Sequence, residues 1–327
     1  MNIRELLRGV VPLRIKGELP SDISSLSCDS RRTEKGSLFF CLGGIDLEGE
    51  AFLPEAAAHG AAAVVAAHPL ESPLPQIIVS SPRAAYASAW NNISRRPGER
   101  LRLLAVTGTN GKTTTKELMS TVLSQTHNVL YTLGNLNNHI GVPLTLLRLR
   151  PEHDLAVVEM GASHPGDIKE LVEIAEPDYG IITNVGKAHL EGFGSFEGII
   201  KTKGEMYDYL RTRKEATIFI HNDNPYLKKI AYGLHQIAYG SEDGLYINGH
   251  VTGNSPYLTF EWKTDNESKY HEVQTRLIGE YNFPNALAAV TIGHFFGVEP
   301  EKIDKALAGY TPQNNRSQLK KTADNTL

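Results

Sequence analysis

The chain has 327 residues, of which 41% are hydrophobic and 21% charged, a composition typical of a folded protein with two or three domains, so disorder is excluded as its main state. A net charge of −4 and a pI near 6.3 offer no basic field to a nucleic acid; a mean hydropathy of −0.26, without an apolar run of about 18 residues, excludes a membrane span. Two cysteines and an N-terminus without an apolar signal segment predict a cytoplasmic location.

The first hundred residues predict a small α/β domain. Short apolar runs indicate buried strands at 36–42, 61–67 and 76–81. Helices are expected at 52–60 and 83–94. The Arg-Arg-Pro-Gly sequence at 95–98 predicts a linker behind this domain.

The middle of the chain predicts a phosphate-binding turn. An apolar strand at 101–108 is followed by glycines at Gly108 and Gly111 and then by a helix that opens with Lys112 and Thr113. Backbone amides and the helix N-terminus would face an anion, Lys112 would reach the β- and γ-phosphates, and the Thr113 hydroxyl would bind Mg²⁺. The usual motif has a glycine where this chain has Val106, so the turn is a shortened variant. The alternative is a glycine turn that merely joins strand to helix.

Two further strand ends carry candidate metal ligands. A strand at 154–161 carries Glu159 near its end, and a strand at 179–186 is followed by His189. Ligands of doubly wound sheets bind beyond the carboxyl ends of the strands, where Thr113, Glu159 and His189 would meet. Oxygen ligands with one imidazole suit Mg²⁺. Alone, Glu159 could be a structural cap, and His189 a surface or core histidine.

The last third predicts an antiparallel patch around residues 245–278. Its strands are expected at 245–253, 256–263 and 270–279, with turns at Asn248–Gly249 and Asp265–Asn266. Helices follow at 279–298 and 299–310. The predicted fold class is therefore α/β, with a small N-terminal α/β domain and a mostly parallel, doubly wound sheet domain that carries the patch.

From residue 106 onward these motifs resemble the Mur ligase family, the ATP-dependent ligases that build the peptidoglycan stem peptide. The family pattern Thr-Gly-Thr-Asn-Gly-Lys-Thr-Thr stands at 107–114. The stretches that resemble the D-alanyl-D-alanine-adding branch are 134–147, 184–195, 281–289 and 314–318.

The N-terminal part resembles a different branch, the one that adds the third residue of the stem peptide. The stretches that carry this likeness are 26–32, 36–44 and 52–65. The resemblance therefore implies a mosaic, either natural or engineered, with a UDP-muramoyl-binding domain at 1–98 and an ATP-binding domain at 99–314. The motif that opens the family's C-terminal domain is not found, so 315–327 would be a truncated linker and the chain alone is expected to turn over poorly.

The resemblance implies an amide ligase that joins D-alanyl-D-alanine to UDP-N-acetylmuramoyl-tripeptide through an acyl phosphate, using ATP and Mg²⁺. It implies a monomer without nucleic-acid or membrane partners. Glu159 and His189 would hold a second Mg²⁺. Lys203, rather than Lys201, would be the lysine that becomes carbamylated and so binds metal; the alternative is a solvated helix lysine.

The resemblance also assigns the nucleotide contacts. The phosphates would lie on the turn, at Gly108, Thr109, Asn110, Gly111, Lys112, Thr113 and Thr114. Asn282 and Asn285 would flank the adenine, and Arg316 would reach the phosphates. Asn282 could instead be a plain helix N-cap.

Two groups of residues are the candidates for the UDP-N-acetylmuramoyl-peptide. Those for the UDP end are Ser30, Arg31, Gly43, Gly44 and Asp46, which could otherwise belong to ordinary turns. Those for the muramoyl-peptide or its metal-bound carboxylate are Asn135, Asn137, Asn138 and His139. That loop could instead cap the helix after Pro143.

Three other functions remain open on the sequence: a ligase with the specificity of the third-residue-adding branch, a non-catalytic nucleotide-binding scaffold, and a folylpolyglutamate synthase. The last shares the phosphate-turn logic but does not account for the UDP-type N-terminal domain.

Overall fold

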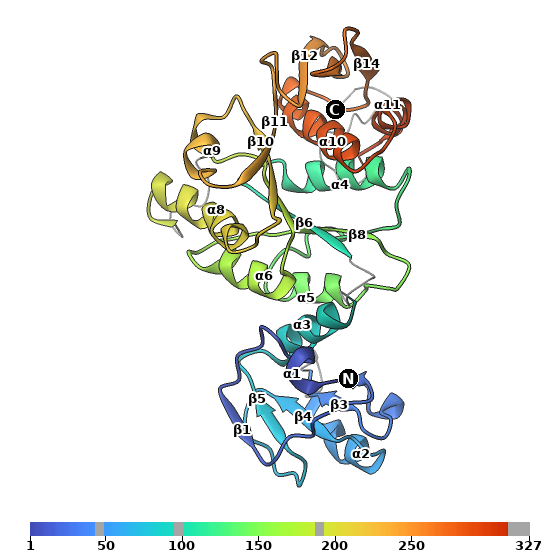
Figure 1. Cartoon of the computed structure of the whole chain (residues 1–327), viewed down its shortest axis with the longest axis vertical. Coiled ribbons are helices and arrows are strands. Elements are labelled where there is room, and N and C mark those ends of the chain that lie inside the picture. Colours follow the sequence, from blue (N-terminus) through green and yellow to red (C-terminus); the bar gives the residue numbers. More distant parts are fainter. Residues whose placement is uncertain (43–48, 95–100, 187–192, 313–327) are drawn as a thin grey trace, which may run out of the picture. The chain divides into compact units, whose positions relative to one another are not determined.

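The computed structural model describes residues 1–42, 49–94, 101–186 and 193–312, and contacts divide the chain into two compact units (Figure 1). The first unit is formed by residues 1–100 with 139–150 and 173–175, and the second by 101–138, 151–172 and 176 onward. The predicted linker at 95–98 and the tail from 313 lie outside the described residues.

The first unit is built on a five-stranded sheet with the order β1-β5-β4-β3-β2. Strands β2 to β5 run parallel, and β1 pairs antiparallel with β5. The strands are β1 (Arg14–Lys16), β2 (Leu26–Ser27), β3 (Leu38–Phe40), β4 (Ala63–Ala66) and β5 (Gln76–Ile78). The helices are α1 (Ile3–Leu6), α2 (Leu53–Ala58), α3 (Pro82–Ser94) and α5 (Gly141–Leu146), with 3-10 turns η1 (Ser30–Arg32) and η2 (Gly49–Phe52).

Alternation along its strands gives this sheet two apolar faces. Phe40 packs with Tyr86 of α3, whereas its neighbour Phe39 belongs to the cluster that includes Leu53 of α2. Successive strand residues point to opposite faces, so each fully apolar run buries both.

The second unit is built on a nine-stranded sheet with the order β14-β13-β12-β11-β10-β9-β6-β8-β7. From β7 to β12 neighbouring strands are parallel, and β12, β13 and β14 form the predicted antiparallel patch. The strands are β6 (Arg102–Thr107), β7 (Val129–Tyr131), β8 (Leu155–Glu159), β9 (Tyr179–Ile182), β10 (Thr217–His221), β11 (His235–Gly240), β12 (Ile247–Gly253), β13 (Thr259–Thr264) and β14 (His271–Gln274).

Helices cover both faces of this sheet (Figure 1). On one face, Val106 and Ile181 share a core with α4 (Lys112–Leu123), α10 (Phe283–Phe295) and α11 (Pro300–Gly309). On the other, a Cβ at Gly180 would stand 2.6 Å from Leu210 of α8 (Phe196–Arg211). Also present are α6 (Asp167–Ala175), α9 (Pro225–Ile230) and the 3-10 turn η3 (Glu280–Asn282). The predicted α/β fold class is confirmed.

One predicted turn is wrong. Asn248 and Gly249 lie inside β12, where they pair with Lys263 and Trp262 of β13. Gly249 is required there by close packing, because a Cβ would stand 2.6 Å from the Glu261 carbonyl and 3.0 Å from Leu287 of α10. The predicted turn at Asp265–Asn266 is present.

Within the described ranges, no helix combines the length and the apolar character that crossing a membrane would require.

Candidate nucleotide and metal site

The turn between β6 and α4 depends on two glycines with positive φ. Gly108 has φ 143° and Gly111 has φ 76°, conformations that disfavour other residues. A Cβ at Gly108 would stand 2.1 Å from the Thr183 hydroxyl, and one at Gly111 would stand 2.5 Å from Oδ1 of Asn285. Gly111 is also the N-cap of α4 and provides no capping side chain, which leaves this helix end suited to an anion.

The end of β9 holds the turn in place. The Asn110 amide donates to Oδ1 of Asn184 (3.0 Å), while its carbonyl accepts from the Asn184 amide (3.0 Å) and from the Thr183 hydroxyl (2.6 Å). The Gly186 amide donates to the Thr109 hydroxyl at 3.0 Å. The turn is therefore fixed before any ligand arrives, which lowers the entropic cost of binding one.

Lys112 and Thr113 begin α4 on this turn. The Lys112 ammonium donates to the carbonyls of Gly108 (2.9 Å) and Thr109 (3.0 Å), so its charge lies over the turn. The Thr113 hydroxyl donates to Oε1 of Glu159 at 3.1 Å. Thr114 is partly exposed. The structure thus brings Thr113 and Glu159 together, as the strand ends predicted.

Glu159, at the end of β8, has chemistry that fits a cation. Its side chain is 1% exposed, and Oε1 also accepts from the Asn137 amide at 2.8 Å. Its other oxygen, Oε2, is buried and has no hydrogen-bond partner among the described residues. A buried carboxylate oxygen without a partner is unfavourable, and Mg²⁺ held by Thr113 and Glu159 would satisfy it. The described ranges hold no cluster of three His, Cys, Asp or Glu residues with metal-binding geometry.

Lys203 and Lys201 differ sharply in environment although both lie on α8. Lys201 is exposed, whereas Lys203 is 3% exposed and its ammonium lies 5.4 Å from the centre of the Phe193 ring. Burial, with a smaller contribution from the charge of Lys112, lowers the pKa of Lys203 to about 8, against the opposing charges of Asp167 and Glu205. The alternative of a solvated lysine at 203 is wrong.

Asn282 and Asn285 form a buried chain of hydrogen bonds that ends on α4. Asn285 accepts from the Thr115 hydroxyl (3.0 Å) and donates to Asn282 (3.1 Å), which in turn donates to the Ile278 carbonyl (2.9 Å). Asn282 stands at the N-cap of α10 but makes no capping bond. These side chains tie α10 to the helix that carries the turn, a structural role that sequence reasoning did not assign to them.

In the loop predicted to contact the muramoyl-peptide, Asn137 contacts the candidate metal site. Asn137 contacts Glu159, and its carbonyl accepts from the Gly161 amide at 2.6 Å. Asn135, Asn138 and His139 are exposed. The helix α5 begins at Gly141, and its N-cap residue Ile140 provides no side-chain capping bond. The alternative that the loop caps this helix stays a prediction.

In the first unit, Ser30 and Arg31 occupy the short turn η1. Ser30 is buried and its hydroxyl donates to Glu55 at 2.5 Å, while the exposed Arg31 makes two bonds of 2.9 Å with Asp29. Gly43, Gly44, Asp46, His189 and Arg316 lie outside the described residues.

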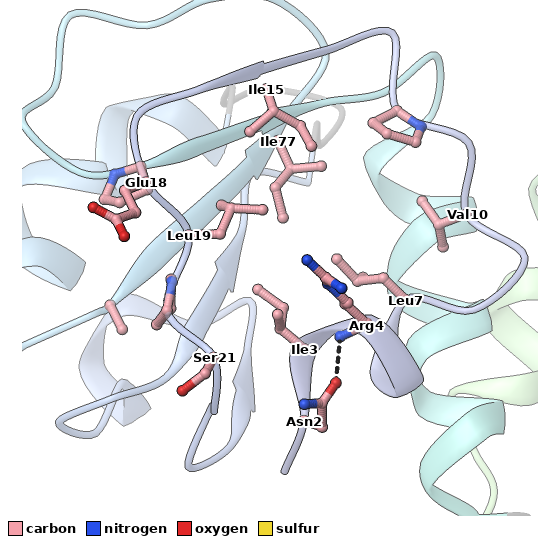
Figure 2. A pocket seen from close by; sticks show the side chains of 14 residues that line it. Asn2, Ile3, Arg4, Leu7, Val10, Ile15, Glu18, Leu19, Ser21 and Ile77 are labelled. Carbon is pink, nitrogen blue, oxygen red and sulfur yellow. Dashed lines mark hydrogen bonds between the residues drawn. The ribbon is translucent and has the colours of Figure 1, made fainter.

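A hollow of about 1110 Å³ opens elsewhere in the first unit, between α1 and the β1 edge (Figure 2). It is lined mainly by apolar side chains, including Leu7, Ile15 and Ile77, and Arg4 points into it. Ser30 and Arg31 do not belong to its lining.

Sequence reasoning missed two residues beside Glu159. Lys116 of α4 is 1% exposed and donates to the Thr132 carbonyl at 2.8 Å. The Thr132 hydroxyl accepts from the Glu159 amide at 3.0 Å. Both act through backbone atoms that are distant in sequence, so residue type and spacing gave no signal for either.

Comparison with known proteins identifies relatives of this chain. A model of the Mur ligase middle domain matches residues 106–293. The UDP-N-acetylmuramoyl-tripeptide–D-alanyl-D-alanine ligase of Escherichia coli is 36% identical over 323 residues, which cover 96% of this chain and 70% of that protein.

Two solved structures are also similar. MurF from Acinetobacter baumannii matches with a TM-score of 0.77 and 28% identity, over 99% of this chain and 71% of that one. MurF from Thermotoga maritima, in complex with ADP, matches with a TM-score of 0.71 and 27% identity, over 91% of this chain and 69% of that one.

Proposed function

The chain belongs to the Mur ligase family, and on that premise we propose that it is an ATP-dependent ligase that joins D-alanyl-D-alanine to UDP-N-acetylmuramoyl-tripeptide. The observation that carries the proposal is the preformed turn of Gly108 to Lys112 beside the buried pair of Thr113 and Glu159. The names of the similar proteins supply the substrates, and the ADP complex of one of them supports ATP as the nucleotide.

The proposed reaction makes an amide in two steps. The substrate carboxylate attacks the γ-phosphorus of ATP and releases ADP, which gives an acyl phosphate. The amine of D-alanyl-D-alanine then attacks the acyl carbon, loses a proton and releases phosphate. Negative charge on the transferring phosphoryl group is the main obstacle, so fixed positive charges and amide donors supply most of the catalysis.

Different residues of this chain contribute to that catalysis. The helix N-terminus of α4 and Lys112 hold the β- and γ-phosphates at the turn. Thr113 and Glu159, which share a hydrogen bond, would hold Mg²⁺, and the ion would neutralise phosphate charge. We place His189 on a second Mg²⁺, Asn282 and Asn285 near the adenine, and Arg316 at the phosphates, as the resemblance implies.

Carbamylation of Lys203 belongs to the same proposal. Carbamylation requires an uncharged amine, which attacks CO₂ and releases a proton to give a carbamate. Burial beside Phe193 disfavours the ammonium form, whereas exposed Lys201 has no such environment. The product would be an anionic ligand where a cation stood, which suits a second metal ion.

We assign the UDP end of the substrate to the first unit, through Ser30, Arg31, Gly43, Gly44 and Asp46, and its peptide end to the loop of Asn135, Asn137, Asn138 and His139. The alignment with the Escherichia coli ligase covers 96% of the chain and therefore includes most of the first hundred residues. The likeness of that part to the third-residue-adding branch, and its origin as a mosaic, stay predictions. So does the monomeric state.

Calorimetric titration tests the proposal. The chain is titrated with UDP-N-acetylmuramoyl-tripeptide and, separately, with the corresponding dipeptide, each with Mg²⁺ and a non-hydrolysable ATP analogue. We expect the tripeptide to bind at least about tenfold more tightly, a difference of about 1.4 kcal/mol. Tighter binding of the dipeptide would favour the third-residue-adding branch. Binding of neither peptide, with the nucleotide still bound, would favour a non-catalytic scaffold.

A further inference from the structure

Lys116 is an unusual residue to find in the interior of the second unit. Its side chain is 1% exposed, and it lies among the largest fully buried side chains of the described residues. Its ammonium donates to the Thr132 carbonyl at 2.8 Å and stands 3.6 Å from a carboxylate oxygen of Glu117. Withdrawing an ammonium from water is costly, and an apolar side chain of similar length would fill the same space without that cost.

The carbonyl to which Lys116 donates belongs to Thr132, a residue whose polar atoms are all engaged. The Thr132 amide donates to Val157 of β8 at 3.1 Å, and its carbonyl accepts from Lys116. Its hydroxyl accepts from the Glu159 amide at 3.0 Å. Thr132 follows β7 directly and is 0% exposed. Thr132 therefore extends the pairing of β7 with β8 as far as Glu159, the proposed metal ligand.

Glu159 is consequently fixed at two points. Thr132 holds its backbone amide, and Asn137 holds Oε1 of its carboxylate at 2.8 Å. Both contacts come from the same short segment, residues 132–137, which directly follows β7. At the end of this segment, the Asn137 carbonyl accepts from the amide of Gly161, two residues beyond β8. Lys116 fixes the start of that segment from α4, the helix that also carries Lys112 and Thr113.

We propose that Lys116 and Thr132 are positioning residues, which hold Glu159 in the orientation that its metal ion requires. Lys116 fixes Thr132, Thr132 fixes the Glu159 backbone, and the buried Oε2 of Glu159 is thereby held for the cation. The inference rests on the proposed function, because it takes the metal ion of that site as given. Residues that orient a metal ligand typically change metal affinity by about 10–100-fold when they are replaced.

The test uses Mn²⁺ as a spectroscopic substitute for Mg²⁺, since both prefer oxygen ligands. Electron paramagnetic resonance measures Mn²⁺ binding to the protein saturated with ADP, and calorimetry measures ADP affinity without metal. The variants are Lys116→Met and Thr132→Val, which remove the two contacts at nearly constant volume. Thr132→Ser keeps the hydroxyl and is the rescue variant. Ser120→Ala removes a buried hydroxyl from the same helix face, which donates to the Lys116 carbonyl, and is the matched control.

We expect Lys116→Met and Thr132→Val to weaken Mn²⁺ binding at least tenfold while ADP affinity without metal stays within about twofold. Thr132→Ser and Ser120→Ala should bind Mn²⁺ like the wild type. Mn²⁺ affinity unchanged in the first two variants would overturn the inference alone. Parallel losses of Mn²⁺ affinity, metal-free ADP affinity and melting temperature would also overturn it, because they indicate a merely structural role. A wild-type protein whose ADP complex binds no Mn²⁺ would overturn the proposed function, and the inference with it.

Discussion

Two lysines on one helix show that the chemistry of a residue depends on its environment as well as on its type. Lys201 and Lys203 are two positions apart on α8, and only the second is buried. Positions two apart lie on different sides of a helix, so one lysine faces solvent and the other the core. The buried one stands beside Phe193 and within the electrostatic reach of Lys112.

The first prediction is that Lys203 alone forms a carbamate. With ¹³C-labelled bicarbonate, the wild-type protein should give a carbamate carbon signal in its NMR spectrum. Lys203→Ala should abolish that signal and Lys201→Ala should leave it unchanged, because only the Lys203 amine is buried where the ammonium form is disfavoured. A signal that survives Lys203→Ala, or one that is absent from the wild type in excess bicarbonate, would contradict the assignment.

Among single residues, the sequence predicted those whose side chains themselves form the site. Thr113 and Glu159 were candidates because a hydroxyl and a carboxylate stood at strand ends, and Asn137 was one because it belongs to a dense polar loop; the structure brings these three together. Lys116 and Thr132 were not, because their contacts pass through a backbone carbonyl and amide 16 and 27 residues away. Such contacts depend on how α4, β7 and β8 pack, which no local pattern encodes.

Among elements, the junction of α10 with α4 determines how rigid the nucleotide turn is. Asn285 touches the turn at Gly111 and accepts from Thr115, one helical turn further along α4. Asn282 continues the chain of hydrogen bonds to Ile278. The two asparagines therefore contribute to stability in the absence of nucleotide, besides their proposed place near the adenine.

The second prediction is that Asn285→Ala lowers the free energy of unfolding by about 1–3 kcal/mol without nucleotide, since it leaves buried polar groups of Thr115 and Asn282 without this partner. Urea unfolding of both proteins measures the difference. Thr291→Val is the control, because the buried Thr291 hydroxyl only donates to the carbonyl of Leu287 in its own helix. Equal stability of Asn285→Ala and wild type would show that Asn285 serves the ligand alone.

Uninterrupted apolar runs were predictable as elements, and mixed ones were not. The strands β6, β8 and β9 and the helices α4 and α8 follow from runs of buried residues. The sequence did not predict β7, in which only the middle residue is buried, or β11, whose first residues are exposed. Gly249 was misplaced in a turn because its close approach to Leu287 is a tertiary contact.

For the whole molecule, two sheets with separate cores give two units. Two partly buried histidines link the stability of the second unit to pH. Burial lowers the pKa of His294, against the charges of Glu267 and Glu299, and burial likewise lowers the pKa of His221, against Asp223. Both rings therefore favour the neutral form in the folded state more than in the unfolded one.

The third prediction follows from the direction of these shifts. In the unfolded chain a histidine takes up its proton near pH 6.5, whereas in the folded protein His294 does so only at lower pH. The unfolded state thus binds more protons below about pH 6.5, and stability falls as the pH drops from there through the folded pKa of His294. The Tyr246 hydroxyl lies 2.8 Å from Nδ1 of His294, and a glutamine amide can also form a hydrogen bond with it. His294→Gln should therefore fold, and should lose less stability than wild type between about pH 7.5 and about pH 5.5.

Urea unfolding at the two pH values measures that loss. His164→Gln, at an exposed position, serves as the control and should lose as much as the wild type. A loss in His294→Gln equal to that of the wild type would show that other groups dominate the pH dependence.

The proposed function depends on nucleotide phosphates lying on the turn between β6 and α4. Calorimetry tests this directly. A non-hydrolysable ATP analogue is titrated with Mg²⁺ into the wild type, Lys112→Ala and Lys201→Ala. Lys112 holds its charge over the turn through the carbonyls of Gly108 and Thr109, whereas Lys201 is exposed on α8. A hydrogen bond to a charged group contributes about 1.5–3 kcal/mol, so Lys112→Ala should weaken binding at least about tenfold. The Lys201→Ala variant should bind like the wild type. Equal affinity of the wild type and Lys112→Ala would contradict the assignment of the turn as the ATP site.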